Sequence, residues 1–150
     1  MSNIEVSIIP EPVKIISEEG IFTFNKKTVI LTDLKLKEIA ELLKQFLAQA
    51  TGLNLDIENL TKIEEKNNAI TLRITDNEKD LKREGYNLIV SQNGIVISAL
   101  TPTGIFYGIQ TLRQLFPPAI EGLTRRNLDW SIPCVIIEDF PRFPWREFML

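Results

Sequence analysis

The chain of 150 residues contains no histidine and only one cysteine. The absence of histidine excludes Ser-His-Asp and Cys-His catalysis, HExxH zinc sites and histidine metal clusters. The single cysteine, Cys134, excludes a disulfide within the chain, and its place in the apolar run IPCVII favours a buried structural thiol. The sequence therefore predicts neither a bound metal nor a cofactor.

An excess of positive charge is also missing. The formal net charge is -3, which gives no basic surface to hold nucleic acid, so we expect no nucleic-acid partner.

Charged residues of either sign are absent from Tyr86 to Leu112, a span long enough in principle to cross a membrane. However, Asn93-Gly94 is a hairpin-turn signal and Thr101-Pro102 a helix start, so the span predicts two strands and a helix instead. The first ten residues, MSNIEVSIIP, lack the basic and apolar segments of a signal peptide.

The residues that are present have the composition of an ordinary globular domain. Apolar residues make up 44% of the chain and charged residues 25%. A chain of this length buries roughly 70% of its unfolded surface, which is enough for a core without disulfides or metals. No repeat, low-complexity tract or Gly/Ser-rich linker divides the sequence, so we expect one domain with a C-terminal extension.

The hydrophobic pattern predicts strands and two helices. The expected strands cover residues 8–24, 28–31, 53–58, 69–75, 86–91, 95–100 and 132–139. Apolar residues recur at three- and four-residue spacing from Leu36 to Ala50, which predicts an amphipathic helix with Gly52 at its left-handed cap. The fold class is therefore α+β, with a mostly antiparallel or mixed sheet and two helices packed on one face.

The second helix carries specific local signals. Thr101 is placed to cap its first turn, Pro102 suits the first helical position, and Pro117-Pro118 ends it. Gly104 and Gly108 lie one turn apart. Because glycine costs up to about 1 kcal/mol in a helix interior, the pair indicates that the helix backbone lies close to the sheet. The apolar face is assigned to Ile105, Phe106, Ile109, Leu112, Leu115 and Phe116.

The acidic stretch TDNEKD is a candidate calcium-binding loop that fails on its spacing. Counted from Asp76, the sixth position requires glycine and is Leu81. The twelfth position requires a bidentate acid and is Asn87. The stretch is therefore interpreted as a solvated loop.

A second pair of acids, Glu138 and Asp139, is also interpreted as structural. Neighbours in a strand point to opposite faces, so these carboxylates are badly placed to flank one substrate bond. Arg142 lies close enough in sequence to form an ion pair with Asp139. Arg146, beside Trp145, is on spacing alone a stacked or paired surface residue. The residues by themselves thus predict a domain without an active site of its own.

Two long motifs near the end of the chain, TPTGIFYGIQTLRQLFP and then IPCVIIEDFPRFPWREFML, resemble the β-N-acetylhexosaminidases among the glycoside hydrolases. The resemblance covers the whole chain and is strongest after Leu100. It implies that residues 1–140 are a non-catalytic N-terminal α/β domain with zincin-like architecture but no metal. The segment FPWREFML is similar to the first strand of the family's catalytic (β/α)8 barrel. Residues 141–150 are therefore expected to begin that barrel, which makes the chain a fragment.

The resemblance also implies an activity for the whole enzyme. Family members remove terminal β-linked N-acetylhexosamine from glycans with retention, and the acetamido group of the sugar acts as the nucleophile. Their catalytic Asp-Glu pair would lie after Leu150, so no catalytic residue is expected in this chain. Arg146 matches the arginine of the family's Trp-Arg-Gly motif, which binds sugar hydroxyls, although Glu147 replaces the glycine.

Three functions remain open. The first is an accessory domain that buttresses the catalytic barrel of the same chain, and the second is the same role in another glycosidase. The third is a free-standing carbohydrate-binding or interaction module, which requires an aromatic platform. The candidates for that platform are Tyr86, Tyr107, Trp130 and Trp145. The resemblance also implies an extracytoplasmic location, either periplasmic or secreted.

Overall fold

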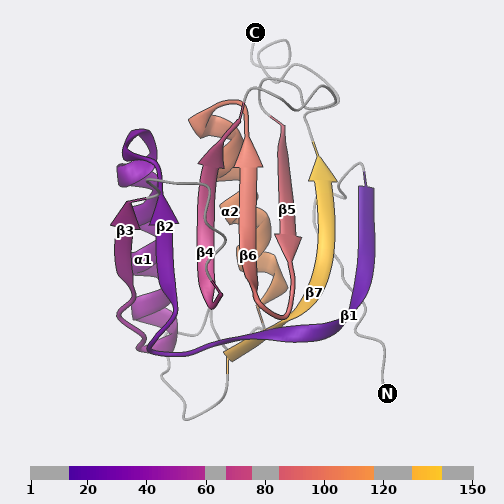
Figure 1. Ribbon diagram of the computed structural model, residues 1–150, viewed down its shortest axis with the longest axis horizontal. Coiled ribbons are helices and arrows are strands. Elements are labelled where there is room, and N and C mark those ends of the chain that lie inside the picture. Colours follow the sequence, from indigo (N-terminus) through magenta and orange to yellow (C-terminus); the bar gives the residue numbers. More distant parts are fainter. Residues whose placement is uncertain (1–13, 60–66, 76–84, 117–129, 140–150) are drawn as a thin grey trace, which may run out of the picture.

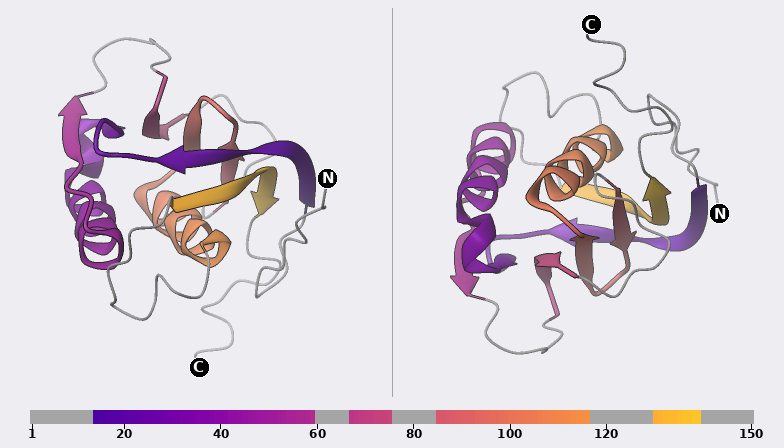
Figure 2. Two further views of the ribbon diagram at one scale, coloured as in Figure 1. Left: turned by 90° about the horizontal axis from the view of Figure 1, so that it is seen from below. Right: turned by 90° about the horizontal axis from the view of Figure 1, so that it is seen from above.

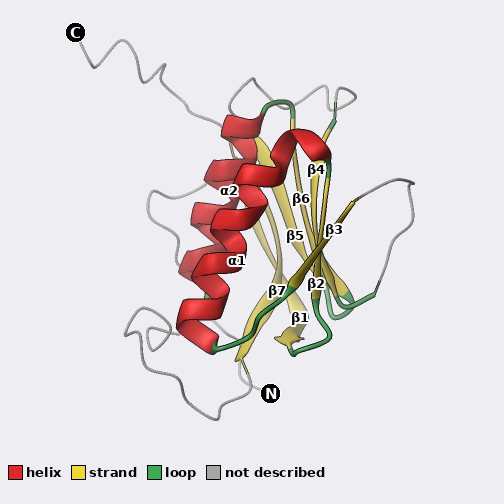
Figure 3. Ribbon diagram, turned by 90° about the vertical axis from the view of Figure 1, so that its left-hand side faces the viewer, coloured by secondary structure: helices red, strands yellow, loops and turns green. Residues whose placement is uncertain are grey.

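The computed structural model describes residues 14–59, 67–75, 85–116 and 130–139. These residues form one seven-stranded sheet with both α-helices on the same face, as Figure 3 shows from the side. The strands are β1 (Lys14–Phe24), β2 (Val29–Thr32), β3 (Asp56–Asn59), β4 (Ala69–Ile74), β5 (Tyr86–Val90), β6 (Gly94–Ala99) and β7 (Trp130–Asp139). The helical elements are the 3-10 turn η1 (Leu34–Leu36), α1 (Lys37–Thr51) and α2 (Pro102–Leu115). The predicted α+β class is confirmed.

The sheet is mixed rather than mostly antiparallel. Its strands lie in the order β1-β7-β5-β6-β4-β2-β3, which can be followed across Figure 1. The neighbours β6, β4, β2 and β3 are parallel, whereas β1, β7, β5 and β6 pair in antiparallel fashion. The parallel strands β2 and β3 are joined through α1, because a parallel pair requires a long crossover connection.

The helices and the sheet enclose the core. The two views along the sheet in Figure 2 place α1 toward the β3 edge and α2 nearer the middle. Accordingly, α1 contacts β2 and β3, while α2 contacts β4, β5 and β6. Beneath the helices, register partners on four adjacent strands form a fully buried row of Leu72, Ile97, Leu88 and Ile137. Burial of such side chains contributes roughly 1.5–3 kcal/mol each.

The predicted caps of both helices are present. Gly52 follows α1 with φ 81 and its N–H donates to the carbonyl oxygen of Ala48 at 2.9 Å. Thr101 precedes α2, and its hydroxyl accepts a hydrogen bond from the backbone N–H of Gly104 at 3.3 Å. Pro102 occupies the first position of the helix. Local sequence signals thus determine where each helix starts or stops.

The backbone of α2 lies against the sheet at its two glycines, as their spacing predicted. A Cβ on Gly104 would overlap the carbonyl oxygen of Gly85 and lie 2.7 Å from Ala99 Cβ. A Cβ on Gly108 would lie 2.5 Å from Ile97 Cγ2. No larger residue fits at either position without moving the helix away from β5 and β6.

The assignment of Phe106 to the apolar face of α2 is wrong. Its side chain is 39% exposed, whereas Ile105, Ile109 and Leu112 are buried. Successive residues are separated by about 100° around a helix, and the two glycines together with Ile105 define the side that faces the sheet. Phe106 therefore points away from it.

The β5–β6 hairpin is confirmed, but its tip lies one residue before the expected dipeptide. Ser91 N–H donates to the carbonyl oxygen of Gly94 at 2.9 Å, so Gln92 and Asn93 form the tip and Gly94 already begins β6. Neither Asn93 nor Gly94 has a positive φ. Glycine is required at 94 for another reason, because a Cβ there would lie 2.9 Å from the carbonyl oxygen of Ala69 in β4.

A polar network joins the amino ends of the parallel strands. At its centre is Asn68, which has φ 60, a conformation that asparagine tolerates better than most residues. Its side chain accepts from Thr28 Oγ1 at 2.6 Å and donates to Asn25 Oδ1 at 3.0 Å. Its backbone N–H donates to the carbonyl oxygen of Asn93 at 2.6 Å, and its carbonyl accepts from Val29 N–H at 3.2 Å. Asn68 thereby connects the starts of β2, β4 and β6.

Replacing Gly104 by alanine is expected to destabilise the chain by about 1–3 kcal/mol in urea unfolding. Alanine is the better helix former by up to about 1 kcal/mol, but its Cβ would overlap a backbone oxygen that cannot rotate away. The matched control is Thr103→Ala at an exposed position of the same turn, expected to change stability by less than about 0.5 kcal/mol. If Gly104→Ala were as stable as the control, α2 would not be held against the sheet as described.

Candidate functional surface

Several predicted site residues lie outside the described part of the chain. They are Arg146 and its neighbour Trp145, Arg142, and two positions of the candidate calcium loop, Asp76 and Leu81. The sugar-binding role of Arg146 and the ion pair of Arg142 with Asp139 therefore stay predictions. The structure does place the remaining candidates.

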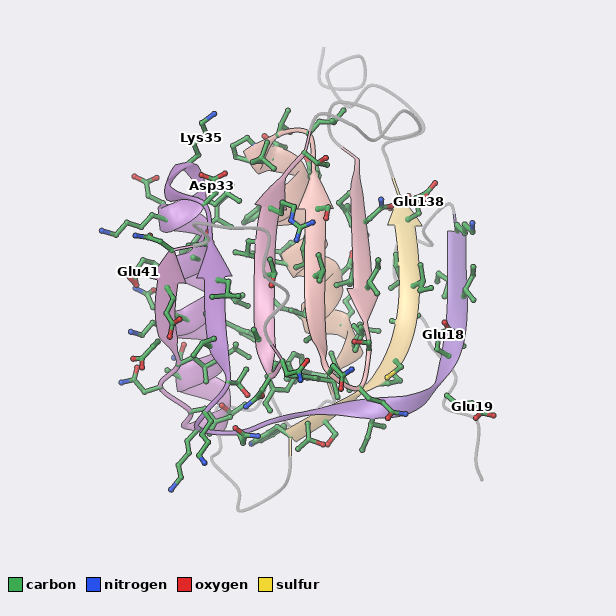
Figure 4. All side chains as sticks on the ribbon, viewed as in Figure 1. Glu18, Glu19, Asp33, Lys35, Glu41 and Glu138 are labelled. Atoms are coloured by element: carbon green, nitrogen blue, oxygen red, sulfur yellow. The ribbon has the colours of Figure 1, made fainter. Side chains whose placement is uncertain are left out.

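The two acids at the end of β7 do not converge on a common site. Glu138 is in register with Lys14 of β1 and Asn87 of β5, and Figure 4 shows it at the carboxyl end of β7. Asp139 is in register with Tyr86. Because the two acids are consecutive in a strand, their side chains leave opposite faces of the sheet. Among the described residues there is also no group of three or more side chains able to hold a metal ion.

Cys134 is a buried free cysteine, as its apolar surroundings in the sequence predicted. Burial raises the pKa of its thiol, and the negative charge of Glu18 raises it further. A raised pKa keeps the sulfur protonated, which opposes its use as a nucleophile or metal ligand. Its role is therefore in packing.

Three of the four aromatic residues proposed for a carbohydrate platform lie in the described part of the chain, and these three do not form one. Tyr86 and Trp130 are buried in the core, and Tyr107 is only partly exposed on α2. The exposed ring nearest to Tyr107 is Phe106, but the two rings are inclined at 57° with centroids 6.2 Å apart. Sugar rings stack on flat exposed aromatic faces, so the described residues do not favour the binding-module hypothesis.

Tyr86 instead joins β5 to α2. Its hydroxyl shares a buried hydrogen bond with the hydroxyl of Thr111. The pKa of Tyr86 is raised to about 12, mainly because burial disfavours the charged phenolate. The hydrogen bond with Thr111 acts in the opposite direction, and the negative charge of Asp139 acts in the same direction as burial. The phenol is therefore a structural group that stays protonated at neutral pH.

The surface that the sequence predictions missed is the outward side of α2. It consists of Pro102, Thr103, Phe106, Tyr107 and Gln110, called here the α2 outer face, all of them exposed or partly exposed. A surface helix normally carries charged residues on this side. The outward side of α1 does so with Lys37, Glu38 and Glu41, the last labelled in Figure 4.

Depletion of charge together with exposed aromatic rings is the composition of the central part of protein interfaces. The signal was present in the sequence, since the uncharged run from Tyr86 to Leu112 continues through most of the second helix. The sequence prediction considered this uncharged run only as a possible membrane span. The structure contains no helix, within its described ranges, that is long and apolar enough for that role.

Comparison with known families decides the identity of the chain. The model of glycosyl hydrolase family 20, domain 2, matches residues 5–140. The chain belongs to this family. The resemblance noted in its two C-terminal motifs is thereby confirmed.

Named hexosaminidases are similar along nearly the whole chain. The β-hexosaminidase of Porphyromonas gingivalis is 37% identical over 146 residues, which is 97% of this chain but 18% of the relative. The β-N-acetylhexosaminidase of Cellulomonas fimi is 26% identical over 145 residues, or 95% of this chain and 27% of the relative.

Solved hexosaminidase structures contain the same fold. The β-N-acetylhexosaminidase of Streptomyces coelicolor matches with a TM-score of 0.81 and 30% identity, over 93% of this chain and 27% of that one. A mutant β-hexosaminidase of Streptomyces plicatus, solved with its product GlcNAc, matches with a TM-score of 0.79 and 29% identity, with the same coverage. The chain thus spans 18% to 27% of the length of these relatives.

The stability of the chain should fall as the pH rises from 10 to 12, because the pKa of Tyr86 is about 12 in the folded chain and about 10 in the unfolded one. The unfolded state releases this proton first, so stability present in full below pH 10 is lost as the pH rises through 12, by about 2–3 kcal/mol. Urea unfolding at a series of pH values measures this loss.

Tyr86→Phe should flatten this part of the profile, whereas Tyr107→Phe, at a partly exposed position, should retain it. An unchanged slope in Tyr86→Phe would mean that another group causes the loss.

Proposed function

We propose that this chain is a non-catalytic accessory domain of a β-N-acetylhexosaminidase and that it has no hydrolase activity by itself. The observation that carries the proposal is its match to domain 2 of family 20 over residues 5–140, in a chain that spans 18% to 27% of named hexosaminidases. The described residues fit this role, because the two neighbouring acids at the end of β7, Glu138 and Asp139, do not converge on a common site. The whole enzyme would remove terminal N-acetylhexosamine from glycans.

The reaction of the whole enzyme follows from the family. Hydrolysis would proceed with retention, and the acetamido group of the substrate would serve as nucleophile in place of an enzyme carboxylate. The GlcNAc product bound to the Streptomyces plicatus relative supports this substrate class. A catalytic Asp-Glu pair beyond Leu150 would orient the acetamido group and supply the general acid.

The proposed domain boundary lies at residue 140. Residues 1–140 would form the accessory domain and residues 141–150 the first part of the catalytic (β/α)8 barrel, and the end of the family match at residue 140 supports this division. Arg146 would then lie in the barrel, where a planar guanidinium with several fixed donors suits paired sugar hydroxyls. The zincin-like architecture and the extracytoplasmic location stay expectations of the family resemblance.

The α2 outer face is the surface proposed to contact the catalytic barrel of the same polypeptide. The relatives are roughly three to five times as long as this chain, so a large part of such an enzyme is available to cover one face of the domain. The five residues of the α2 outer face are uncharged and include the exposed Phe106. The first charged residue further along the same side of the helix is Arg113, whose guanidinium lies 4.7 Å from the ring centroid of Phe46. The opposite face of the sheet also has exposed apolar side chains, Ile16 and Ile89. It is the poorer candidate because the charged residues Arg73 and Glu138 lie on the same face.

Hydrolysis of a chromogenic β-N-acetylglucosaminide tests the function. The 150-residue chain should be inactive, and a chain that continues through the following domain should be active. Activity in neither would mean that the barrel has another chemistry. Activity in the short chain would contradict the accessory role.

Replacing Phe106 by glutamate tests the contact in the longer chain. The charge would be buried without a partner at the domain interface, so the Tm of the longer chain should fall by several degrees. The 150-residue chain, where the side chain is 39% exposed, should change little. The matched control is Ile89→Glu on the opposite face, at 41% exposure, which should affect both chains equally. An equal effect of Phe106→Glu on both chains would remove the α2 outer face from the interface.

A further inference from the structure

Asn93 occupies an exposed position at the tip of the β5–β6 hairpin. Its carboxamide has no hydrogen-bond partner among the described residues, so the side-chain carbon is open to attack. Its backbone carbonyl, in contrast, is held firmly by the N–H of Asn68 at 2.6 Å. The side chain of Asn93 therefore has no described partner, whereas its backbone carbonyl is fixed by a hydrogen bond.

The next residue, Gly94, supplies a nucleophile that is weakly held. Its backbone N–H donates to the hydroxyl of Ser91 at a long 3.3 Å. Ser91 is itself exposed, and its hydroxyl also donates to the carbonyl of Gly94 at 3.1 Å. Glycine has no Cβ to shield its nitrogen, and β4 prevents a larger residue from taking its place.

We propose that Asn93 is a site of spontaneous deamidation. The backbone nitrogen of Gly94 attacks Cγ of Asn93, an N–Cγ bond forms, and the Cγ–Nδ2 bond breaks. The amide proton of Gly94 leaves with the amino group as ammonia. Water then opens the resulting succinimide ring at either carbonyl carbon, which yields aspartate or isoaspartate. Asparagine is among the thermally labile residues of proteins for this kind of reason.

The isoaspartyl product alters the polar network that Asn68 organises. In that product the chain to Gly94 runs through the side chain of residue 93, and the original backbone carbonyl becomes a free carboxylate. The acceptor of the Asn68 N–H then no longer lies in the peptide link that begins β6. There is little space beside Gly94 for the altered chain, because even a Cβ built on Gly94 would lie 2.9 Å from the carbonyl oxygen of Ala69. The aspartyl product leaves this backbone intact.

Incubation of the 150-residue chain at mildly alkaline pH, followed by peptide mass spectrometry, tests the proposal. Asn93 should gain the mass difference between NH2 and OH faster than Asn54, which is also exposed but precedes Leu55. Ser91→Ala should speed the reaction severalfold, because the hydroxyl that holds the Gly94 N–H is removed. Asn93→Gln should abolish it. If Asn93 reacted in urea but not in the folded chain, the hairpin would protect it and the proposal would be wrong.

The stability of the products distinguishes the two outcomes of ring opening. The isoaspartyl form, separated by chromatography, should have a Tm about 2–4 °C lower than the unmodified chain. Asn93→Asp adds the same charge without lengthening the backbone, so its Tm should stay within about 1 °C of the unmodified value. Equal Tm values for the isoaspartyl and Asn93→Asp forms would show that residue 93 does not support the network in the way described.

Discussion

The close contact between α2 and the sheet is the constraint on which most of the structure depends. Gly104 and Gly108 let the helix backbone touch Gly85 and Ile97, and the buried hydrogen bond of Tyr86 with Thr111 joins the same two layers. This contact fixes the rotation of the helix about its own axis. That rotation buries Ile105 and Ile109 and leaves the α2 outer face turned away from the core.

The local elements of this fold were predictable because short-range chemistry specifies them. A glycine with positive φ ends α1, a threonine and a proline start α2, and apolar alternation marks the β5–β6 hairpin. The strand order and the parallel pairing of β2, β3, β4 and β6 were not predictable in this way. They depend on contacts between distant segments, which a periodic pattern in one segment does not contain.

Two errors have instructive physical causes. Phe106 was predicted to lie on the apolar face because it is an apolar residue of the helix. It is exposed because Gly104 and Gly108 determine which side of the helix faces the sheet. Gly94 was assigned to the turn, whereas its small size is required by the neighbouring strand β4. In both cases a tertiary contact, not a local preference, decides the role of the residue. The α2 outer face was harder to predict than the fold, because it is recognised by the absence of charged residues and no sequence motif marks it.

The pairing of β1 with β7 has a consequence for biosynthesis. The side chains of Thr23 and Ser131 share a hydrogen bond of 2.8 Å although they are 108 residues apart in sequence. While the chain is being made, β1 is an unpaired edge strand, and it stays so until the ribosome has passed residue 139. The sheet is complete only when its last strand emerges, immediately before any domain that follows. In a longer polypeptide, this topology would delay closure of the first domain until synthesis of the second begins.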